Sequence, residues 1–382
     1  MYKIKKLNKI SPIINGIFDD KYVLGDEEIT NPEGIIVRSF NMNEYETNEE
    51  LLAISRAGAG VNNIPVEKMA QKGVVVFNTP GANANAVKEL VICGMLLACR
   101  DIIGGNQWVN TLTENVAKTA EKGKSNFAGI EVFGKTLGVI GLGAIGGKVA
   151  NTALSLGMDV VGYDPCLSEN LKAQLDKNVK IVDFDTLIKE SDFITLHVPL
   201  LDSTKNMINK DVIANMKDGA IIINMARGGL VNFADLKNAL TSGKVRKYVV
   251  DFPDENVINT EGIIVLPHLG ASTEEAEDNC AVMAAKELKD YIENGNINNS
   301  VNYPRCSAPK MSAVRLAICH LNQHNMIAQF TTILAENSIN IEYLVNSSKG
   351  AYAYSMIDIP SVDSATIERL KNIEGVIRVR KL

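Results

Sequence analysis

Charged side chains follow three consecutive apolar segments in the second half of the chain, at the points where predicted strands end. Arg227 follows the first segment, Asp254 and Glu255 follow the second, and His268 follows the third. A guanidinium holds a carboxylate through paired hydrogen bonds, and an imidazole accepts a hydroxyl proton near neutral pH. A carboxylate beside the imidazole fixes its tautomer and raises its pKa. Each group alone has an ordinary structural explanation, but together they predict hydride transfer at a 2-hydroxy acid.

A second group of residues is typical of a phosphate-binding turn. Gly141, Gly143 and Gly146 form a Gly-x-Gly-x-x-Gly motif between a predicted strand and a predicted helix. The first glycine permits the tight turn, the second lets the backbone approach a pyrophosphate, and the third allows close packing of helix on strand. Asp164 lies 23 residues after Gly141, where a carboxylate accepts from a ribose 2′-hydroxyl and repels a 2′-phosphate. The motif therefore predicts NAD rather than NADP, although glycine turns that bind nothing also occur.

Alternating strand and helix patterns would bring these residues to one place. Between residues 130 and 270, short apolar runs alternate with helical stretches, which is typical of a parallel sheet with helices on both faces. The predicted strands are Thr136–Ile140, Asp159–Tyr163, Phe193–His197, Ala220–Met225, Tyr248–Asp251 and Ile263–Leu266. Ligands of such sheets bind outside the carboxyl ends of the strands, where the charged side chains are predicted to lie.

The N-terminal region repeats this pattern more weakly. Its predicted strands are Gly34–Arg38, Ala53–Ala57 and Val74–Asn78. Gly58 and Gly60 follow the second strand and expose backbone N–H groups that can receive a carboxylate. Long helices are predicted over residues 86–100 and 274–295.

The last part of the chain has a different order of elements. Residues 296–309, with several Asn and two Pro, predict a linker. The strands predicted after it are 313–320, 339–346, 351–359 and 375–380, and the helices are 326–337 and 364–371. This βαββαβ order predicts a small ferredoxin-like domain.

Composition excludes several classes of protein. The chain has 382 residues, 46% of them hydrophobic and 22% charged, with a net charge of −6. This mild acidity argues against a nucleic-acid binder, and no apolar run approaches the roughly 20 residues that a membrane span needs. The lysine-rich start has no apolar stretch after it, so a signal peptide is not expected. Six scattered cysteines without a Cys-x-x-Cys pair favour a reduced, cytoplasmic protein without a zinc site or any other metal.

Four motifs in order resemble the D-isomer-specific 2-hydroxyacid dehydrogenases. Within that family, the chain resembles the phosphoglycerate dehydrogenases that carry a C-terminal ACT domain. The motifs are Gly141–Gly146, His197–Leu200, Asn224–Gly229 and Pro267–Thr273. The resemblance covers essentially the whole chain.

The resemblance implies a role for each motif. Arg227 would bind the substrate carboxylate, His268 would act as the acid/base, and Glu255 would be the acid that partners it. The residues implied to contact NAD are Ile145, Asp164, His197, Pro199, Thr204, Ala226, Asp251 and Gly270.

The position of the acid departs from the family pattern. The family acid lies in an Asp-Val-Phe-x-x-Glu-Pro string, whereas the corresponding segment from Asp251 to Glu255 is shorter by one residue. We therefore prefer Glu255 and keep Asp254 as the alternative. His197 is a conceivable second base, but the family places this residue in a turn beside the cofactor, and we prefer that role.

The resemblance also implies two further sites. In similar enzymes the arginine of a Val-Arg-Ser sequence helps to bind the substrate phosphate, which makes Arg38 the candidate here, with an ordinary surface arginine as the alternative. The implied substrate-binding residues are Arg38, Ser39, Gly58, Ala59 and Gly60. In the last domain, the residues His320, Asn322 and Asn340 match a serine-binding pattern. The usual Pro-Gly turn is His324-Asn325 here, so serine binding and a purely oligomerising role both stay open.

The implied fold class is α/β, with two doubly wound parallel-sheet domains and a C-terminal ferredoxin-like ACT domain. A Rossmann-type NAD domain (residues 94–273) would be inserted in a flavodoxin-like substrate domain (residues 1–93 and 274–305), with the ACT domain at 311–382. The implied reaction is NAD-dependent oxidation of 3-phospho-D-glycerate to 3-phosphohydroxypyruvate, the first step toward serine, by a homodimer or homotetramer. The alternatives are a glyoxylate or hydroxypyruvate reductase, and a regulatory protein that binds NAD without turnover.

Overall fold

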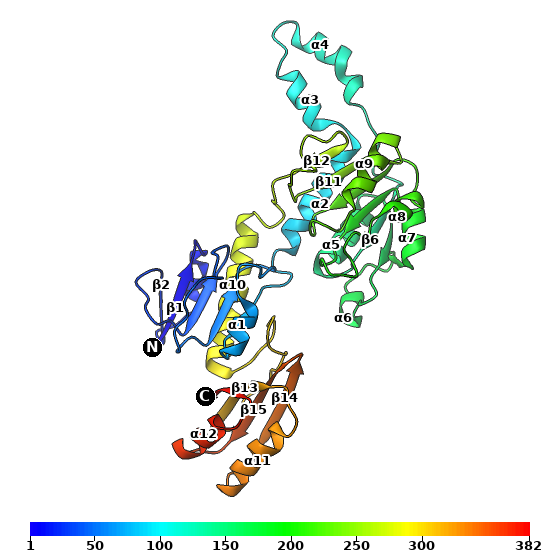
Figure 1. Ribbon diagram of the computed structural model, residues 1–382. Helices are drawn as coiled ribbons and strands as arrows, with labels where there is room; N and C mark the ends of the chain where they lie inside the picture. The colour runs from blue at the N-terminus through cyan, green and yellow to red at the C-terminus, as the bar shows by residue number, and fades with distance from the viewer. The chain divides into compact units, whose positions relative to one another are not determined.

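Two units make up the computed structural model, which covers residues 1–382 (Figure 1). The second unit, residues 83–276, interrupts the first, which consists of residues 1–82 and 277–382. The domain boundary that the sequence predicts at residues 93 and 94 falls inside helix α2 (Ala84–Cys99), all of which belongs to the second unit. The C-terminal segment belongs to the first unit, so the division follows side-chain packing rather than the predicted linker.

A seven-stranded parallel sheet forms the centre of the second unit, in the order β12-β11-β10-β9-β6-β7-β8. Its strands are β6 (Thr136–Ile140), β7 (Asp159–Tyr163), β8 (Lys180–Ile181), β9 (Phe193–Leu196), β10 (Ala220–Asn224), β11 (Val245–Val250) and β12 (Ile263–Val265). The six predicted strands are confirmed. Strand β8 was not predicted because its two residues are exposed and too few to show a pattern.

Helices cover both faces of this sheet. Successive residues of β10 point to opposite faces, so that Ile221 and Ile223 pack with α2 and α5, whereas Ile222 packs with α7 and α9. The helices of this unit, besides α2, are α5 (Ala144–Ser155), α6 (Glu169–Lys172), α7 (Phe184–Glu190), α8 (Lys210–Ala214) and α9 (Phe233–Ser242). Strand β6 lies between β7 and β9, so the order reverses there, and a crevice for ligands forms outside the carboxyl ends of such strands.

Helices α3 (Ile102–Val109) and α4 (Val116–Gly123) follow α2 and were not predicted. Neither contains a buried residue, and in Figure 1 they extend beyond the sheet of their unit. Trp108 of α3 packs on Phe127 of the short helix η2 (Lys124–Phe127), which follows α4, with ring centroids 5.2 Å apart. Helix α3 has no buried face, so its sequence carries little amphipathic signal.

The first unit contains a five-stranded parallel sheet in the order β2-β1-β3-β4-β5. The elements are β1 (Tyr2–Leu7), η1 (Pro12–Gly16), β2 (Tyr22–Gly25), β3 (Gly34–Val37), β4 (Ala53–Arg56), α1 (Val66–Gln71), β5 (Val75–Phe77) and α10 (Glu274–Asn294). Strands β3, β4 and β5 are confirmed. Strands β1 and β2 were not predicted, because Lys3, Lys5 and Lys6 interrupt the apolar pattern of β1.

A four-stranded antiparallel sheet follows, in the order β14-β15-β13-β16. Its elements are β13 (Val314–Leu321), α11 (Met326–Glu336), β14 (Tyr343–Lys349), β15 (Tyr352–Ile359), α12 (Ser364–Lys371) and β16 (Val376–Lys381), which confirms the predicted βαββαβ order. One face packs on α11 and α12 through Phe330 and Leu370. The other face, through Cys319 and Tyr354, joins the core that contains Tyr291 of α10, and this shared core explains why both sheets form one unit.

The carboxyl end of α10 is capped by side chains of the antiparallel sheet. Arg380 donates hydrogen bonds to the carbonyls of Tyr291 (3.1 Å) and Ile292 (2.7 Å). The Tyr354 hydroxyl donates to the carbonyl of Gly295 at 2.7 Å. Helix ends leave carbonyls without intrahelical partners, and cations near them are favoured by the helix dipole. The antiparallel sheet therefore supplies the hydrogen-bond donors that the last carbonyls of α10 lack.

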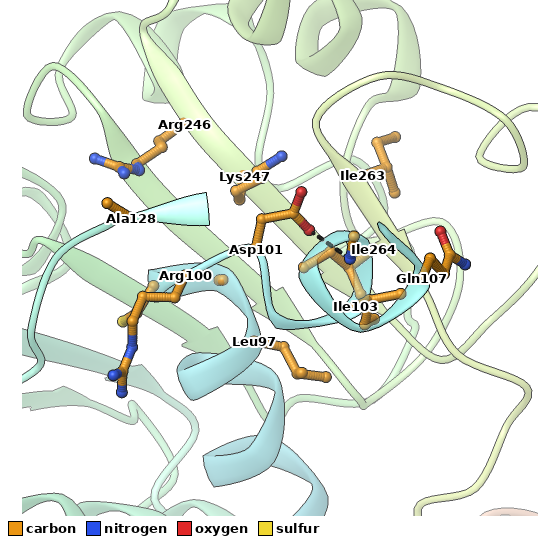
Figure 2. A pocket seen from close by; sticks show the side chains of 13 residues that line it. Leu97, Arg100, Asp101, Ile103, Gln107, Ala128, Arg246, Lys247, Ile263 and Ile264 are labelled. Carbon is orange, nitrogen blue, oxygen red and sulfur yellow. Dashed lines mark hydrogen bonds between the residues drawn. The ribbon is translucent and has the colours of Figure 1, made fainter. Parts of the chain in front are cut away.

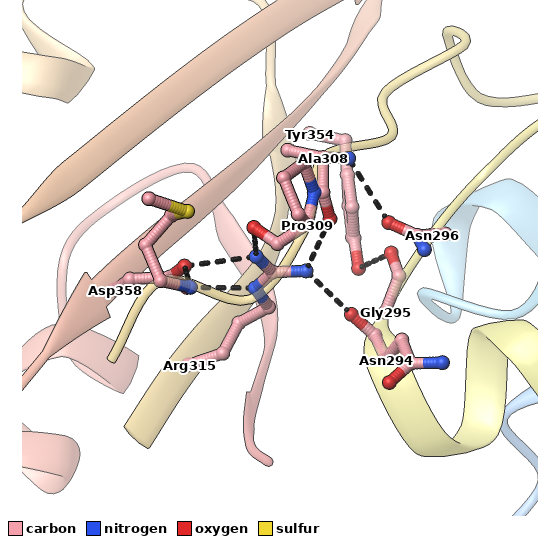
Figure 3. Close-up of polar contacts among 9 residues, drawn as sticks. Asn294, Gly295, Asn296, Ala308, Pro309, Arg315, Tyr354 and Asp358 are labelled. Atoms are coloured by element: carbon pink, nitrogen blue, oxygen red, sulfur yellow. Dashed lines mark hydrogen bonds and ion pairs between the residues drawn. The ribbon is translucent and has the colours of Figure 1, made fainter. Parts of the chain in front are cut away.

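Arg315 of β13 makes the strongest connection (Figure 3). Its guanidinium is fully buried and forms a paired contact with Asp358, at 2.7 and 2.8 Å. The remaining donors reach the carbonyls of Asn294, Ala308 and Pro309. Because every donor finds an acceptor, the buried charge is compensated. One arginine thus joins the sheet, the linker and the end of α10.

No helix of the chain has both the length and the apolar character needed to cross a membrane.

Candidate active site

The glycine motif joins β6 to α5 in the second unit, and its three glycines are needed for different reasons. Gly141 has a φ of +92°, and a Cβ there would lie 2.6 Å from the carbonyl oxygen of His197. A Cβ on Gly146 would lie 1.8 Å from the carbonyl oxygen of Gly141. A Cβ on Gly143 would meet nothing within 4 Å. The fold requires the first and third glycines, whereas the second leaves open space at a helix N-terminus, as a pyrophosphate site needs.

Asp164 lies at the end of the neighbouring strand β7 and turns its carboxylate toward this loop. One carboxylate oxygen accepts a hydrogen bond from the backbone N–H of Leu142 at 2.9 Å, and the other accepts from the N–H of Cys166 at 2.8 Å. These bonds fix the carboxylate and leave each oxygen a second lone pair for a ribose hydroxyl. The Asp164 carboxylate thus lies against the glycine motif, and its role toward a ribose stays a prediction.

Asp251 follows β11 and is 1% exposed. Its Oδ2 accepts from the backbone N–H of Gly270 at 3.2 Å, whereas its Oδ1 is buried without a partner. Burial raises the pKa of Asp251, against the opposing charges of His268 and Arg227. An unpartnered buried acceptor is unusual in a folded protein. It fits the amide N–H₂ of a nicotinamide ring, and the side chains present therefore suit the dinucleotide that the glycine motif predicts.

His197 follows β9 and is held as a neutral imidazole. Burial lowers its pKa to about 3. Nε2 lies 3.0 Å from the Thr195 hydroxyl, and Nδ1 is buried without a partner. A group with this pKa does not work as a base near neutral pH, which agrees with a role beside the cofactor. In the turn that follows, the Thr204 hydroxyl donates to the carbonyl of Pro199 at 2.6 Å.

Arg227 is placed by a buried asparagine that the sequence analysis did not single out. The Asn224 side chain donates to the carbonyl of Arg227 at 2.8 Å and accepts from the N–H of Ala226 at 3.1 Å. Asn224 Nδ2 also lies 3.1 Å from the Tyr248 hydroxyl. These hydrogen bonds fix the loop, and the Arg227 side chain is exposed at the carboxyl edge of the sheet. A polar residue at the end of an otherwise apolar strand is the signal that would have identified Asn224.

His268 lies at the same edge, and its ring packs on Phe252 with centroids 4.6 Å apart. The structure does not join it to Glu255, whose exposed carboxylate has no hydrogen-bond or ion-pair partner. The Asp254 carboxylate instead accepts from the backbone N–H groups of Asn256 (2.8 Å) and Val257 (3.1 Å). Asp254 is therefore occupied in stabilising its own turn. The charge of His268 acts on Asp251, where it opposes the rise in pKa that burial causes.

The carboxyl edge of the sheet in the first unit carries the predicted substrate residues. Arg38 follows β3, and its Nη1 lies 2.7 Å from Oε1 of Glu277, in the first turn of α10. The backbone N–H groups of Ala59 and Gly60 have no partner within the protein, so they are available to an anion. The prediction was wrong for Gly58, whose N–H donates to the carbonyl of Arg56 at 2.8 Å. Ser39 donates its backbone N–H to Asn8 at 3.2 Å.

Arg56 ends β4 and was not predicted as a site residue. Its Nε donates to the carbonyl of Arg38 at 3.2 Å, and a Cβ on Gly58 would lie 2.1 Å from its Nη1. The guanidinium therefore lies directly against the glycine. Asn78 supports the same loop by donating to the carbonyl of Ala59 at 2.6 Å. The Arg-Ala-Gly-Ala-Gly sequence at a strand end was the available signal for Arg56.

The predicted effector residues of the antiparallel sheet do not share contacts. His320 is buried, with Nδ1 2.8 Å from the carbonyl of Leu321 and Nε2 3.0 Å from the Ser355 hydroxyl and 3.2 Å from Asn346 Oδ1. Burial lowers its pKa. The Asn322 side chain donates to the carbonyl of Gly350 at 3.0 Å, and Asn340 is exposed. Both ring nitrogens of His320 are thus occupied within its own domain.

A cavity of about 410 Å³ in the second unit lies at the amino ends of the sheet strands, away from the carboxyl edge that carries Arg227 and His268 (Figure 2). Arg246 and Lys247, at the start of β11, line it together with Arg100 at the end of α2. Asp101 accepts from the N–H of Gly104 at 2.9 Å and so caps α3. None of the predicted site residues lines this cavity.

Four features at one sheet edge define a nucleotide-dependent dehydrogenase site. They are the glycine turn, the unpartnered Asp251 oxygen, Arg227 and His268. Residues 92–270 match the family model described as the D-isomer specific 2-hydroxyacid dehydrogenase, NAD binding domain. The chain is 42% identical over 252 residues to the hydroxypyruvate reductase of Thermotoga maritima, covering 64% of this chain and 78% of that one. The protein therefore belongs to the D-isomer-specific 2-hydroxyacid dehydrogenase family, and its cofactor is NAD.

Other relatives extend further along the chain. The D-3-phosphoglycerate dehydrogenase of Haemophilus influenzae is 35% identical over 352 residues, covering 88% of this chain and 82% of that one. The enzyme of that name from Methanocaldococcus jannaschii is 36% identical over 333 residues, which is 85% of this chain but 61% of the relative. The chain thus spans less than two thirds of that relative's length. The NAD⁺-bound 3-phosphoglycerate dehydrogenase structure from Entamoeba histolytica has a TM-score of 0.61 at 27% identity, covering 79% of this chain and 98% of that one.

Proposed function

We propose that this protein interconverts 3-phospho-D-glycerate and 3-phosphohydroxypyruvate with NAD. The observation that carries the proposal is that each unit has a sheet edge with one half of the required chemistry. The carboxyl edge of the second unit's sheet holds Arg227, His268 and the glycine turn, and that of the first unit holds Arg38 with the free amides of Ala59 and Gly60. A substrate with a carboxylate at one end and a phosphate at the other suits this set of groups. Relatives named D-3-phosphoglycerate dehydrogenase match most of the chain.

The residues of the second unit divide the reaction between them. Arg227 holds the C1 carboxylate through paired hydrogen bonds. His268 takes the proton of the C2 hydroxyl as the C2–H bond breaks, which leaves a ketone. The oxidised nicotinamide ring, when bound, accepts the hydride. We propose Glu255 as the acid that supports the His268 imidazolium, because Asp254 is engaged in its own turn.

We assign residues 94–273 to the NAD domain, residues 1–93 and 274–305 to the substrate domain, and residues 311–382 to an ACT domain. The four-stranded sheet with its two helices supports the last assignment. Serine as an effector requires His320 to release Asn346 or Ser355. We further propose a homodimer or homotetramer that works in the cytoplasm.

A hydroxypyruvate reductase is the second candidate, favoured by the 42% identity to the Thermotoga maritima relative. The two candidates differ in what Arg38 holds, because hydroxypyruvate has no phosphate.

Initial rates with NADH and a panel of 2-keto acids separate the two. We expect the highest kcat/KM with phosphohydroxypyruvate, well above hydroxypyruvate and glyoxylate. A higher value with glyoxylate or hydroxypyruvate would favour the second candidate, and binding of NADH without turnover of any keto acid would indicate a regulatory protein.

A further inference from the structure

Arg38 and Glu277 form an ion pair at the substrate edge of the first unit. The two residues come from β3 and from the first turn of α10, and 2.7 Å separates Nη1 from Oε1. The side chains are 33% and 41% exposed, so water and a ligand can reach both. The pair is therefore accessible and exchangeable rather than part of the core.

The groups around the pair leave Glu277 as its only acidic partner. The Arg56 guanidinium lies on the neighbouring strand and holds the carbonyl of Arg38. Asp278, the next acid of α10, accepts a hydrogen bond from the Ser11 hydroxyl. Both arginines and Glu277 act on the pKa of buried Cys280, although its burial has the largest effect and raises that pKa. Glu277 is thus the carboxylate that an incoming anion would have to replace on Arg38.

An exposed ion pair of this kind is weak, and its partner can be replaced. A phosphate carries nearly two negative charges near neutral pH and presents three acceptor oxygens. It can displace a carboxylate from a guanidinium, whereas a hydroxyl group cannot. The cost of displacing Glu277 nevertheless lowers the affinity of Arg38 for phosphate, and the displaced carboxylate repels the dianion.

We propose that Glu277 is a specificity-determining residue that acts as an internal counter-ion, competing with the substrate phosphate for Arg38 and setting its affinity. This inference rests on the proposed function, since it takes Arg38 as the phosphate anchor. When a phosphorylated product leaves, the Glu277 carboxylate takes its place on the guanidinium. The competition keeps the arginine paired at every stage and prevents the dianion from binding too tightly.

The variant Glu277→Gln tests the inference, with Glu275→Gln as the matched control. Glu275 lies in the same helical turn, is exposed and has no partner, so the control changes the net charge equally without touching Arg38. We expect E277Q to lower KM for phosphohydroxypyruvate about tenfold, with KM for hydroxypyruvate changed less than about twofold. We expect E275Q to leave both values within about twofold of the wild type.

Two results would overturn the inference. A rise in KM in E277Q would mean that Glu277 orients Arg38 instead of competing with the phosphate. Equal falls in E277Q and E275Q would mean that only the overall charge matters.

Inorganic phosphate keeps this test separate from the proposed function. Its inhibition constant against whichever keto acid the enzyme reduces should fall about tenfold in E277Q and stay unchanged in E275Q. If the wild type does not reduce phosphohydroxypyruvate, the proposed function fails. The inhibition constants then still decide whether Glu277 competes with phosphate for Arg38.

Discussion

The two parallel sheets of this protein present differently prepared edges to their ligands. In the second unit, buried hydrogen bonds of Asn224 and Asp251 fix the loops before any ligand arrives. In the first unit, the charged groups are half-exposed, and Arg38 is held by a carboxylate that a ligand can replace. If the proposed function holds, cofactor recognition relies on loops that are fixed in advance, whereas substrate recognition relies on exchangeable side-chain pairs. Substitutions should therefore fail in different ways at the two edges.

The largest effect should come from the chemistry at the fixed edge. His268→Ala removes the proposed proton acceptor, and we expect kcat to fall by about 10²- to 10⁴-fold. The dissociation constant of NADH, measured by fluorescence titration, should change less than about twofold, because the glycine turn is untouched. A variant that kept the wild-type kcat would show that another group moves the proton.

Substitution of the glycines should show which of them the fold needs. Gly143→Val adds atoms to open space, so we expect a wild-type melting temperature but an NADH affinity about a hundredfold lower. Gly146→Ala forces a Cβ against the Gly141 carbonyl, which should cost about 1–3 kcal/mol and lower the melting temperature by several degrees. Melting curves and NADH titrations of both variants check this. The reverse outcome would mean that Gly143 is structural and that the cofactor lies elsewhere.

The exchangeable edge should lose substrate affinity and keep its fold. A charge-assisted contact is worth about 1.5–3 kcal/mol, so Arg38→Ala should raise KM for phosphohydroxypyruvate by about 10- to 150-fold. KM for hydroxypyruvate should stay nearly unchanged. The control is Arg246→Ala. Arg246 lies in the second unit, is exposed and has no partner, so its removal should leave KM for both substrates unchanged. Equal losses on both substrates would make Arg38 a structural residue.

The smallest effect concerns Glu287, a buried acid of α10 in the first unit. Burial raises its pKa to about 7, partly opposed by a hydrogen bond from Asn299. Because the unfolded value is near 4.3, the folded state binds the extra proton between about pH 4.5 and 7, and stability falls as pH rises through that range.

The variant Glu287→Gln should remove this slope. We expect the melting temperatures at pH 5 and pH 8 to differ by several degrees less than in the wild type. Glu274→Gln, on the exposed start of the same helix, should keep the wild-type profile. An unchanged slope in E287Q would place the titrating group elsewhere.

The elements that could be predicted from the sequence are those whose position depends on a local residue pattern. Strands such as β10, buried at every position, and the glycine turn were located because their signals lie within a few neighbouring residues. Strand β1 was missed because its lysines break the pattern, and α3 because it has no buried face. Partnerships over long sequence distances, such as Arg38 with Glu277, leave no local signal. The same holds for Glu255, whose predicted contact with His268 depends on loop geometry and is absent from the structure.

The way α10 ends has a consequence for the order in which the chain becomes structured during synthesis. The second unit is continuous from residue 83 to 276, so it can collapse as soon as it leaves the ribosome. The first unit must wait, because the carbonyls at the end of α10 are satisfied by Arg315, Tyr354 and Arg380. Domains generally fold in the order of their synthesis. Here residues 1–82 precede the second unit in the chain, yet their unit is completed only after residues 277–382 have been made.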